Sequence, residues 1–299
     1  MSVGRPSNKS MGFGFCALLM WSVMAVLLSE LTDIPLFQMT TCTFGVTFLV
    51  VASKLTLKKQ WHRIKQPWWV WLLGTMGICG SDFFYMAAFK HAPPAHVDFI
   101  DYLWPFLIIL MTSAMPKEKF TWSQIIGGIC CLLGVYCLFA ASGETVLSTQ
   151  VIYVKGYIFA LMGALAWSIY NILSRSIKTE IPVEMYGMYA GIGAVTSLVV
   201  HQSVETWQMP SLYEGSLLGI TGLFGLAYML WDTGTRYGDI RVLSLLAYFT
   251  PIMSVTFLVL AGKQDFSVYL ILACFWVISG VLIGSLDWST VFKKALVKA

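Results

Sequence analysis

The sequence predicts an all-α membrane protein with ten transmembrane helices, arranged as two inverted five-helix repeats around a central cavity. The prediction depends on the composition, on the distribution of lysine and arginine between the loops, and on a similarity between the two halves. Of the 299 residues, 58% are hydrophobic and only 11% are charged, and the mean hydropathy is +0.74. Because a soluble domain has about 25% charged residues, this composition excludes an ordinary soluble protein.

Ten apolar stretches are long enough to cross a bilayer, which takes ~20 residues. They cover residues 11–29, 35–53, 67–89, 95–115, 122–141, 156–174, 182–201, 213–233, 242–261 and 267–286. The loops between them are too short to fold as a separate domain. The first stretch is longer than a signal peptide and no A-x-A cleavage pattern follows it, so we expect a retained first helix.

Lysine and arginine alternate between the two sides of these stretches. If the N-terminus is cytoplasmic, the cytoplasmic segments hold 16 of the 19 basic residues, and only Lys90, Lys155 and Lys263 lie on the opposite side. Cytoplasmic loops of membrane proteins carry such an excess. The pattern predicts a multi-pass protein of the inner (plasma) membrane with both termini in the cytoplasm.

The two halves of the chain resemble each other at an offset of 146 residues. The offset pairs Trp21 with Trp167, Ser22 with Ser168, Gly45 with Gly191, Tyr102 with Tyr248, Pro105 with Pro251, Phe120 with Phe266 and Gly134 with Gly280. We therefore predict an N-terminal tail (1–10), a first repeat (11–142), a connecting loop (143–155), a second repeat (156–286) and a C-terminal tail (287–299). Five helices per repeat is an odd number, so the second repeat is inverted, as in many secondary transporters that work by alternating access.

The fourth stretch carries polar residues where an apolar helix is expected. Asp98, Asp101, Tyr102 and Pro105 share one helical face, and Trp104 lies ~14 Å into the membrane at 1.5 Å per residue. A charge near the bilayer centre costs ~3 kcal/mol, so we expect the face of Asp101 to line a cavity. Asp98 is nearer the boundary and has an alternative interpretation as a solvated interfacial residue.

Other stretches add candidate substrate-binding residues. The third stretch carries Asp82 and Tyr85, although Asp82 also fits a role in helix packing. The first and sixth carry Trp21, Trp167, Tyr170 and Asn171. Trp104 and Trp167 are predicted to lie deep and to line a cavity, where their rings can bind aromatic groups by stacking and cations by their faces.

Several residues have both a mechanical and a structural interpretation. Pro105 and Pro251 kink their helices, either as paired hinges or as structural bends. The glycine pairs Gly187/Gly191, Gly215/Gly219 and Gly280/Gly284 are spaced for close helix approach. Asp232, Arg236, Asp239 and Arg241 are interpreted as solvated loop charges in preference to ion pairs of an inner gate.

No residue pattern indicates catalysis, a metal or a cofactor. The seven cysteines lie in apolar stretches without a CxxC motif, and the four histidines are scattered without HExxH spacing. A membrane enzyme is therefore disfavoured, and no filter motif or sensory domain indicates a channel or a receptor. We expect a small-molecule substrate, a lipid bilayer environment, no nucleic-acid partner, and a monomer or a homodimer.

The repeat layout, the "WS" of the first and sixth stretches and the proline of the fourth and ninth resemble the EamA branch of the drug/metabolite transporter superfamily. Within it, "YLWP" (102–105) and "AWSIYN" (166–171) resemble the YddG-type aromatic amino acid exporters. The resemblance implies that Tyr85, Tyr102, Trp104 and Trp167 line a central cavity, and it makes aromatic amino acids the leading substrates. Tyr248, the repeat partner of Tyr102, is a further candidate.

This chain departs from that pattern at Asp101, where a neutral asparagine is usual. Asp82 and Asp98 add two more acids, and the repeat partners of Asp98 and Asp101 are the uncharged Ser244 and Ala247. The acids suit a cationic or nucleoside-like metabolite such as S-adenosylmethionine. Alternatively, Asp82, Asp98 or Asp101 couples transport to a proton or cation, or the protein is an exchanger.

Overall fold

The computed structural model describes residues 8–113, 121–140, 151–176 and 181–285, and all side chains in them except those of residues 94 and 95. Its described residues form helices and no strand, as the all-α prediction requires. The predicted tails fall almost wholly outside the described residues, as does most of the predicted connecting loop.

Helices of the first half follow the predicted stretches. They are α1 (Asn8–Leu28), α2 (Leu36–Leu57), η1 (Trp61–Ile64), α3 (Trp68–Gly74), η2 (Thr75–Cys79), α4 (Gly80–Phe89), α5 (Pro94–Asp101), α6 (Trp104–Ser113) and α7 (Trp122–Ala140). The π-helical turn η2 joins α3 to α4 without a break. It coincides with Gly77, whose missing Cβ would lie 2.3 Å from the Cβ of Tyr170 on α8.

Helices of the second half are η3 (Val151–Tyr153), α8 (Val154–Ser176), α9 (Met185–Val204), α10 (Leu212–Phe224), α11 (Ala227–Tyr237), α12 (Ile240–Ala247), α13 (Phe249–Leu260) and α14 (Val268–Ser285). Seven segments of the described residues, each a single helix or a run of consecutive helices, are long and apolar enough to span a membrane. The predicted spans 95–115, 182–201 and 213–233 are not among the seven. The count of ten thus remains a prediction.

Two of those predicted spans are broken for identifiable reasons. Pro105 has no N–H to donate to the carbonyl of Asp101, and α5 ends at Asp101. Between α10 and α11, the hydroxyl of Thr47 donates to the carbonyl of Gly222 (2.7 Å) and lies where a Cβ of Gly225 would be. The same proline effect interrupts 242–261, because α12 ends at Ala247, four residues before Pro251.

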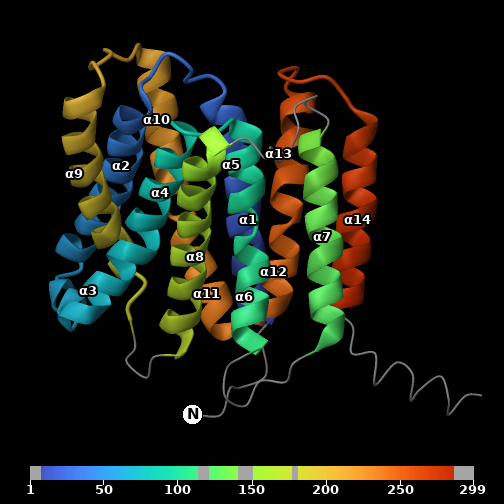
Figure 1. Cartoon of the computed structure of the whole chain (residues 1–299). Coiled ribbons are helices and arrows are strands. Elements are labelled where there is room, and N and C mark those ends of the chain that lie inside the picture. The colour runs from blue at the N-terminus through green and yellow to red at the C-terminus, as the bar shows by residue number, and fades with distance from the viewer. Residues whose placement is uncertain (1–7, 114–120, 141–150, 177–180, 286–299) are drawn as a thin grey trace, which may run out of the picture.

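The helices stand side by side, with α2 and α9 at one edge and α7 and α14 at the other (Figure 1). The helix α1 begins, and α8 ends, at the lower face of this view. We call the opposite face, which carries the loops 29–35, 205–211 and 261–267, the upper face.

Glycines allow the close packing at both edges. A Cβ on Gly127 of α7 would lie 2.5 Å from the carbonyl oxygen of Gly280 on α14, and one on Gly187 of α9 would lie 2.4 Å from Val51 on α2. Gly191 and Gly284 are similarly crowded, as predicted. The prediction for Gly215 and Gly219 was wrong, because nothing lies within 4 Å of a Cβ at either position.

Two hydrogen bonds relate the halves in a reciprocal way. The Ser22 hydroxyl on α1 donates to the carbonyl of Thr250 (3.3 Å), and the Ser168 hydroxyl on α8 donates to the carbonyl of Trp104 (3.0 Å). The two donors, Ser22 and Ser168, are 146 residues apart in the sequence, and so are the two acceptors, Trp104 and Thr250. Each bond ends beside a proline, so it meets a carbonyl at the interrupted helix of the other half.

Candidate functional site

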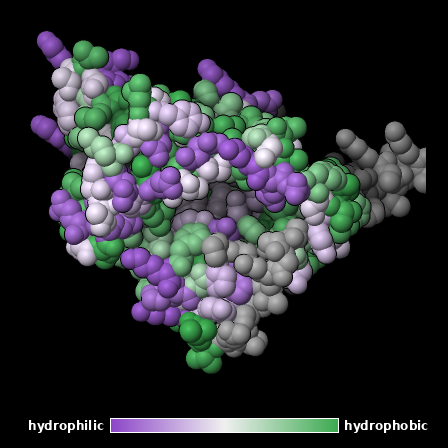
Figure 2. Space-filling model, turned by 90° about the horizontal axis from the view of Figure 1, so that it is seen from above, coloured by the Kyte–Doolittle hydropathy of each residue, from purple (hydrophilic) through white to green (hydrophobic). Residues whose placement is uncertain are grey.

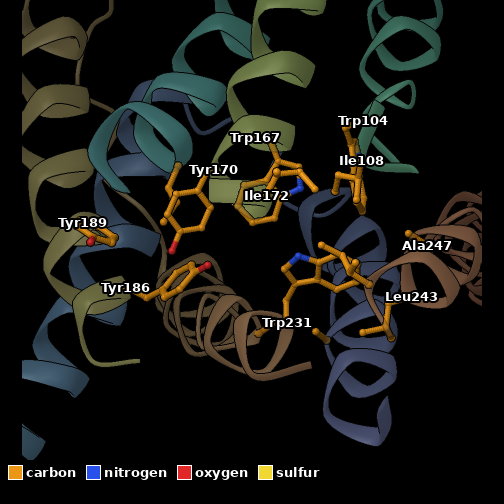
Figure 3. Packing of buried hydrophobic residues seen from close by; sticks show 14 of the residues in the cluster. Trp104, Ile108, Trp167, Tyr170, Ile172, Tyr186, Tyr189, Trp231, Leu243 and Ala247 are labelled. Carbon is orange, nitrogen blue, oxygen red and sulfur yellow. The ribbon is translucent and has the colours of Figure 1, made fainter. Parts of the chain in front are cut away.

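Eight aromatic side chains from five helices meet in the middle of the molecule and form a central aromatic cluster, and six of them are labelled in Figure 3. Its members are Trp21 on α1, Trp104 on α6, Trp167 and Tyr170 on α8, Tyr186 and Tyr189 on α9, and Tyr228 and Trp231 on α11. All except Trp21 and Tyr228 are buried, and these two are partly buried.

The rings contact one another mainly edge to face. Trp21 and Trp167 are repeat partners, and their ring centroids are 6.4 Å apart. Trp104 lies 6.3 Å from Trp167 and 5.5 Å from Trp231, and Tyr228 lies 5.5 Å from Trp167. Such aromatic pairs stabilise by about 0.5–1.5 kcal/mol each beyond their burial, so the cluster is a preorganised wall of π faces and edges.

The side-chain amide of Asn171 holds part of this cluster in place through two hydrogen bonds. The indole Nε1–H of Trp231 donates to Oδ1 of Asn171 (2.7 Å), while Nδ2 of Asn171 donates to the carbonyl of Trp167 (2.9 Å). Both Asn171 and Trp231 are at most 1% exposed. The amide therefore connects α8 to α11 and fixes the orientation of the tryptophan ring.

The sequence reasoning selected Trp21, Trp104, Trp167, Tyr170 and Asn171, and the structure brings these five together. It missed Tyr186, Tyr189, Tyr228 and Trp231. A signal for two of them was available, because the offset of 146 places Tyr228 and Trp231 opposite Asp82 and Tyr85, which the sequence did select.

An acidic group adjoins the aromatic cluster. It consists of Asp82 and Tyr85 on α4, Asp98 and Asp101 on α5, and Tyr102, all partly buried. The Tyr85 hydroxyl donates to Oδ1 of Asp98 (2.5 Å). Asp101 lies close enough to Asp98 and Asp82 for their negative charges to repel one another. Tyr228 of the aromatic cluster lies close enough to Asp82 and Asp101 to interact with them electrostatically.

No basic side chain of the described residues pairs with these acids. None of the ion pairs in that part of the chain includes Asp82, Asp98 or Asp101, and Oδ2 of Asp82 is buried without a hydrogen bond. Like charges without a counterion repel one another in a low-dielectric region. The acidic group thus favours a cation, either a bound one or a proton.

Three further predicted residues, Tyr248, Pro105 and Pro251, are not part of the aromatic cluster or the acidic group. Tyr248 is fully buried with Ile109, Cys131 and Leu245, in a separate core between α7 and α14, so the structure does not bring it to the aromatic cluster. Pro105 and Pro251 lie just after the helix breaks, both buried.

The lower side of the aromatic cluster is closed by a buried ion pair. Nε of Arg236 lies 2.7 Å from Oδ1 of Asp232, with these side chains 10% and 1% exposed, and Nη1 of Arg236 donates to the carbonyl of Ile181 (2.8 Å). The interpretation of Asp232 and Arg236 as solvated loop charges was therefore wrong. The α11 helix extends to Tyr237 and carries both residues into the core, which a loop assignment did not anticipate.

The upper face is hollowed near its middle, and hydrophilic residues lie around the hollow (Figure 2). On this face, Lys263 and Glu30 form an ion pair that joins the loop after α13 to the loop after α1. The hydrogen bond and charge of Glu30 raise the pKa of Lys263 above its usual range. Within the described ranges, no group of three or more His, Cys, Asp or Glu side chains could hold a metal ion.

Comparisons with known proteins agree with this architecture. The model of the EamA-like transporter family matches twice, at residues 8–140 and 154–286. The aromatic amino acid exporter YddG of Ancylobacter novellus is 34% identical over 278 residues, covering 91% of this chain and 96% of that protein. YddG of Salmonella typhimurium is 26% identical over 60% of this chain and 64% of its own length.

A solved crystal structure superposes with a TM-score of 0.85 at 32% identity, covering 93% of this chain and 98% of that one. The relatives are named as exporters and the matched family is one of transporters, so the protein is a multi-pass membrane transporter and not an enzyme, as predicted. With two family matches that together cover most of its length, the chain belongs to the EamA-like transporter family.

Proposed function

We propose that this transporter moves aromatic amino acids across the inner membrane by alternating access between two inverted five-helix repeats, residues 11–142 and 156–286. The observation that carries the proposal is the central aromatic cluster beside the acidic group. Helices of both predicted repeats contribute to the cluster, Trp21 and Trp104 from the first and the other six rings from the second.

The reciprocal serine bonds support the inverted repeat. Ser22 and Ser168 each donate to the interrupted helix of the other half, and the family model matches once in each half. The helices α1 and α8, which carry these serines, run in opposite directions (Figure 1). If each interrupted helix pair is one span, the described elements can be grouped into ten spans, and α1 begins at the same face at which α14 ends. We propose that this face is the cytoplasmic one, because the basic residues gather there.

The site suits a ligand with an aromatic ring and an amino group. The rings of Trp104, Trp167 and Tyr228 offer edges and faces for stacking, and the acids Asp82 and Asp101 near Tyr228 offer a counterion for an ammonium group. Tyr85, Tyr102, Tyr170 and Trp21 complete the binding residues that we propose. Asn171 acts through Trp231, and we leave Tyr248 out of the site.

The closed lower side and the hollowed upper face support an alternating mechanism. In the structure, Asn171–Trp231 and Asp232–Arg236 hold α11 beneath the aromatic cluster. We propose that this state opens upward, and that bending at Pro105 and Pro251 closes the upper side while α11 releases the lower side. Broken helices with hinge residues are common in transporters that rock one repeat against the other.

A second substrate class is favoured by one specific observation. The three carboxyl groups have no basic partner among the described residues, which suits a cationic or nucleoside-like metabolite such as S-adenosylmethionine. The same acids suit proton coupling through Asp82, Asp98 or Asp101. Both alternatives require that at least one of these three carboxyl groups carry a charge.

Counterflow in proteoliposomes tests the proposal. Vesicles loaded with unlabelled tryptophan or phenylalanine should accumulate the labelled amino acid transiently and saturably, and a panel of amines and nucleosides tests the second class. If no compound of either class shows saturable counterflow, the proposal is wrong.

Two substitutions assign the site residues. Trp104→Phe keeps an apolar ring but loses indole contacts, so the apparent substrate constant should rise about 2- to 10-fold, whereas Trp276→Phe on α14 should leave it unchanged. Asp101→Asn should weaken counterflow of ammonium-bearing substrates and should alter its pH dependence if protons are coupled. Unchanged kinetics in both variants would exclude the proposed site.

A further inference from the structure

The end of α2 and the turn that follows it form the most basic segment of the described chain. Residues 54–65, "KLTLKKQWHRIK", contain five lysine or arginine residues and no acid. Lys54 and Arg63 share Glu184 of the adjoining segment, at 2.9 and 3.3 Å, yet their side chains remain 41% and 38% exposed. None of the ion pairs between described residues uses Lys58, Lys59 or Lys65, and all three are exposed. Most of this charge is therefore available to an outside partner.

The backbone holds one of these lysines in a conformation that favours glycine. Lys59 has φ = 53°, and its N–H and that of Gln60 bond back to Thr56 and Leu55, which is a helix C-terminal turn. Glycine is usual at this position because a Cβ is disfavoured there. A lysine in this place directs an additional positive charge to the end of α2 at a conformational cost, and such strain is found at functional positions.

Two open apolar grooves lie along α2, and the first of them reaches this segment. One groove, of about 520 Å³, follows α2 from Leu49 and Val50 to Leu57, and its basic end is formed by Lys54 and Lys58. Nine residues of helix correspond to ~14 Å, which is about half of the ~30 Å hydrocarbon layer.

The second groove, of about 500 Å³, lies between α2, α3 and α9 and is lined by Phe48, Trp71, Met188 and Val195. Met188 is one turn from Glu184, the acid that holds Lys54 and Arg63. The three helices lie together at one edge of the molecule (Figure 1). Trp61 and Trp68, 41% and 76% exposed, flank the basic segment as interfacial tryptophans do.

We propose that this corner is a binding site for one anionic phospholipid, with the phosphate held by Lys58, Lys59 and Lys65 and an acyl chain in a groove of α2. Clusters of four or more basic residues directly beside a membrane helix attract anionic lipids. The site shares no residue with the transport proposal and does not depend on it. In this proposal the basic segment has two roles: it helps to set the orientation of the chain in the membrane, and it binds the lipid phosphate.

The purified full chain in detergent tests the site by native mass spectrometry. The probes are phosphatidylglycerol, phosphatidylcholine with the same acyl chains, and glycerol 3-phosphate, which has the phosphate but no acyl chain. Phosphatidylglycerol should be retained and phosphatidylcholine lost, and glycerol 3-phosphate should not displace the lipid. Equal retention of the two lipids, or displacement by glycerol 3-phosphate, would overturn the proposal without any variant.

A matched pair of double variants locates the site. Lys58→Gln with Lys59→Gln should weaken phosphatidylglycerol binding on the order of 30-fold, from about 5-fold per lysine. Lys90→Gln with Lys155→Gln, which removes two charges near the upper face, should leave the binding unchanged. Lys59→Gly separates charge from strain, because it should weaken lipid binding and raise the melting temperature together. Unchanged lipid binding in both Lys59 variants would also overturn the proposal.

Discussion

The hydrogen bond between Asn171 and Trp231 is buried and connects α8 to α11, so its loss should have a measurable effect on stability. Asn171→Leu has a similar size but offers no acceptor, so the indole N–H of Trp231 loses its partner at a site that is 0% exposed. An unsatisfied buried donor costs about 1–3 kcal/mol. For a protein of this size, about 1 kcal/mol corresponds to a melting shift of roughly 2–4 °C. We expect Asn171→Leu to melt roughly 2–12 °C below the wild type.

A double-mutant cycle separates this bond from the other effects of the substitution. Trp231→Phe removes the donor, so Asn171→Leu should cost much less in that background, and the loss of the Asn171–Trp167 bond is common to both backgrounds and cancels. The assay is the recovery of monodisperse protein after heating in detergent. If the two substitutions add without coupling, the bond does not stabilise this state and the reasoning is refuted.

Two further predictions concern packing and charge. Gly127→Ala should lower the melting temperature because its Cβ would lie 2.5 Å from a carbonyl oxygen on α14. Gly215→Ala should raise the melting temperature, because nothing lies within 4 Å of its Cβ and alanine is preferred to glycine in a helix by about 1 kcal/mol. Equal shifts in the two variants would contradict the packing argument. Asp232→Asn should cost about 3–5 kcal/mol because it leaves Arg236 buried without a counterion, and Asp232→Leu with Arg236→Met should recover most of the loss. A wild-type melting temperature for Asp232→Asn would show that the ion pair is not required.

The sequence predicted where helices form, although not every break in them, and it identified half of the central aromatic cluster. Apolar stretches set the helix positions because a bilayer requires them, and Pro105 and Pro251 marked both proline breaks. Trp21 and Trp167 were identifiable because they repeat at the offset of 146. These signals are local or periodic, so they can be recognised without knowing how the helices pack.

The rest depended on which helices become neighbours. Trp231 joins the cluster because α11 extends beneath α8 and Asn171 accepts its N–H. Tyr186 joins it because α9 packs against α2 through Gly187. Tyr102 and Tyr248 are repeat partners, yet only Tyr102 adjoins the acids, since Tyr248 lies between α7 and α14. Sequence spacing gives the face of a helix but not the neighbour that the face meets.

Alternating access is the central claim, and site-directed labelling from both sides of the membrane tests it most directly. In a cysteine-free background, Phe89→Cys reports on the upper side and Thr235→Cys, beneath the aromatic cluster, on the lower side. Asn171→Leu, which releases α11, should raise the labelling rate of Thr235→Cys and lower that of Phe89→Cys, and a transported substrate should change the two rates in opposite directions. Rates that stay constant, or that rise together as in an open channel, would contradict the account.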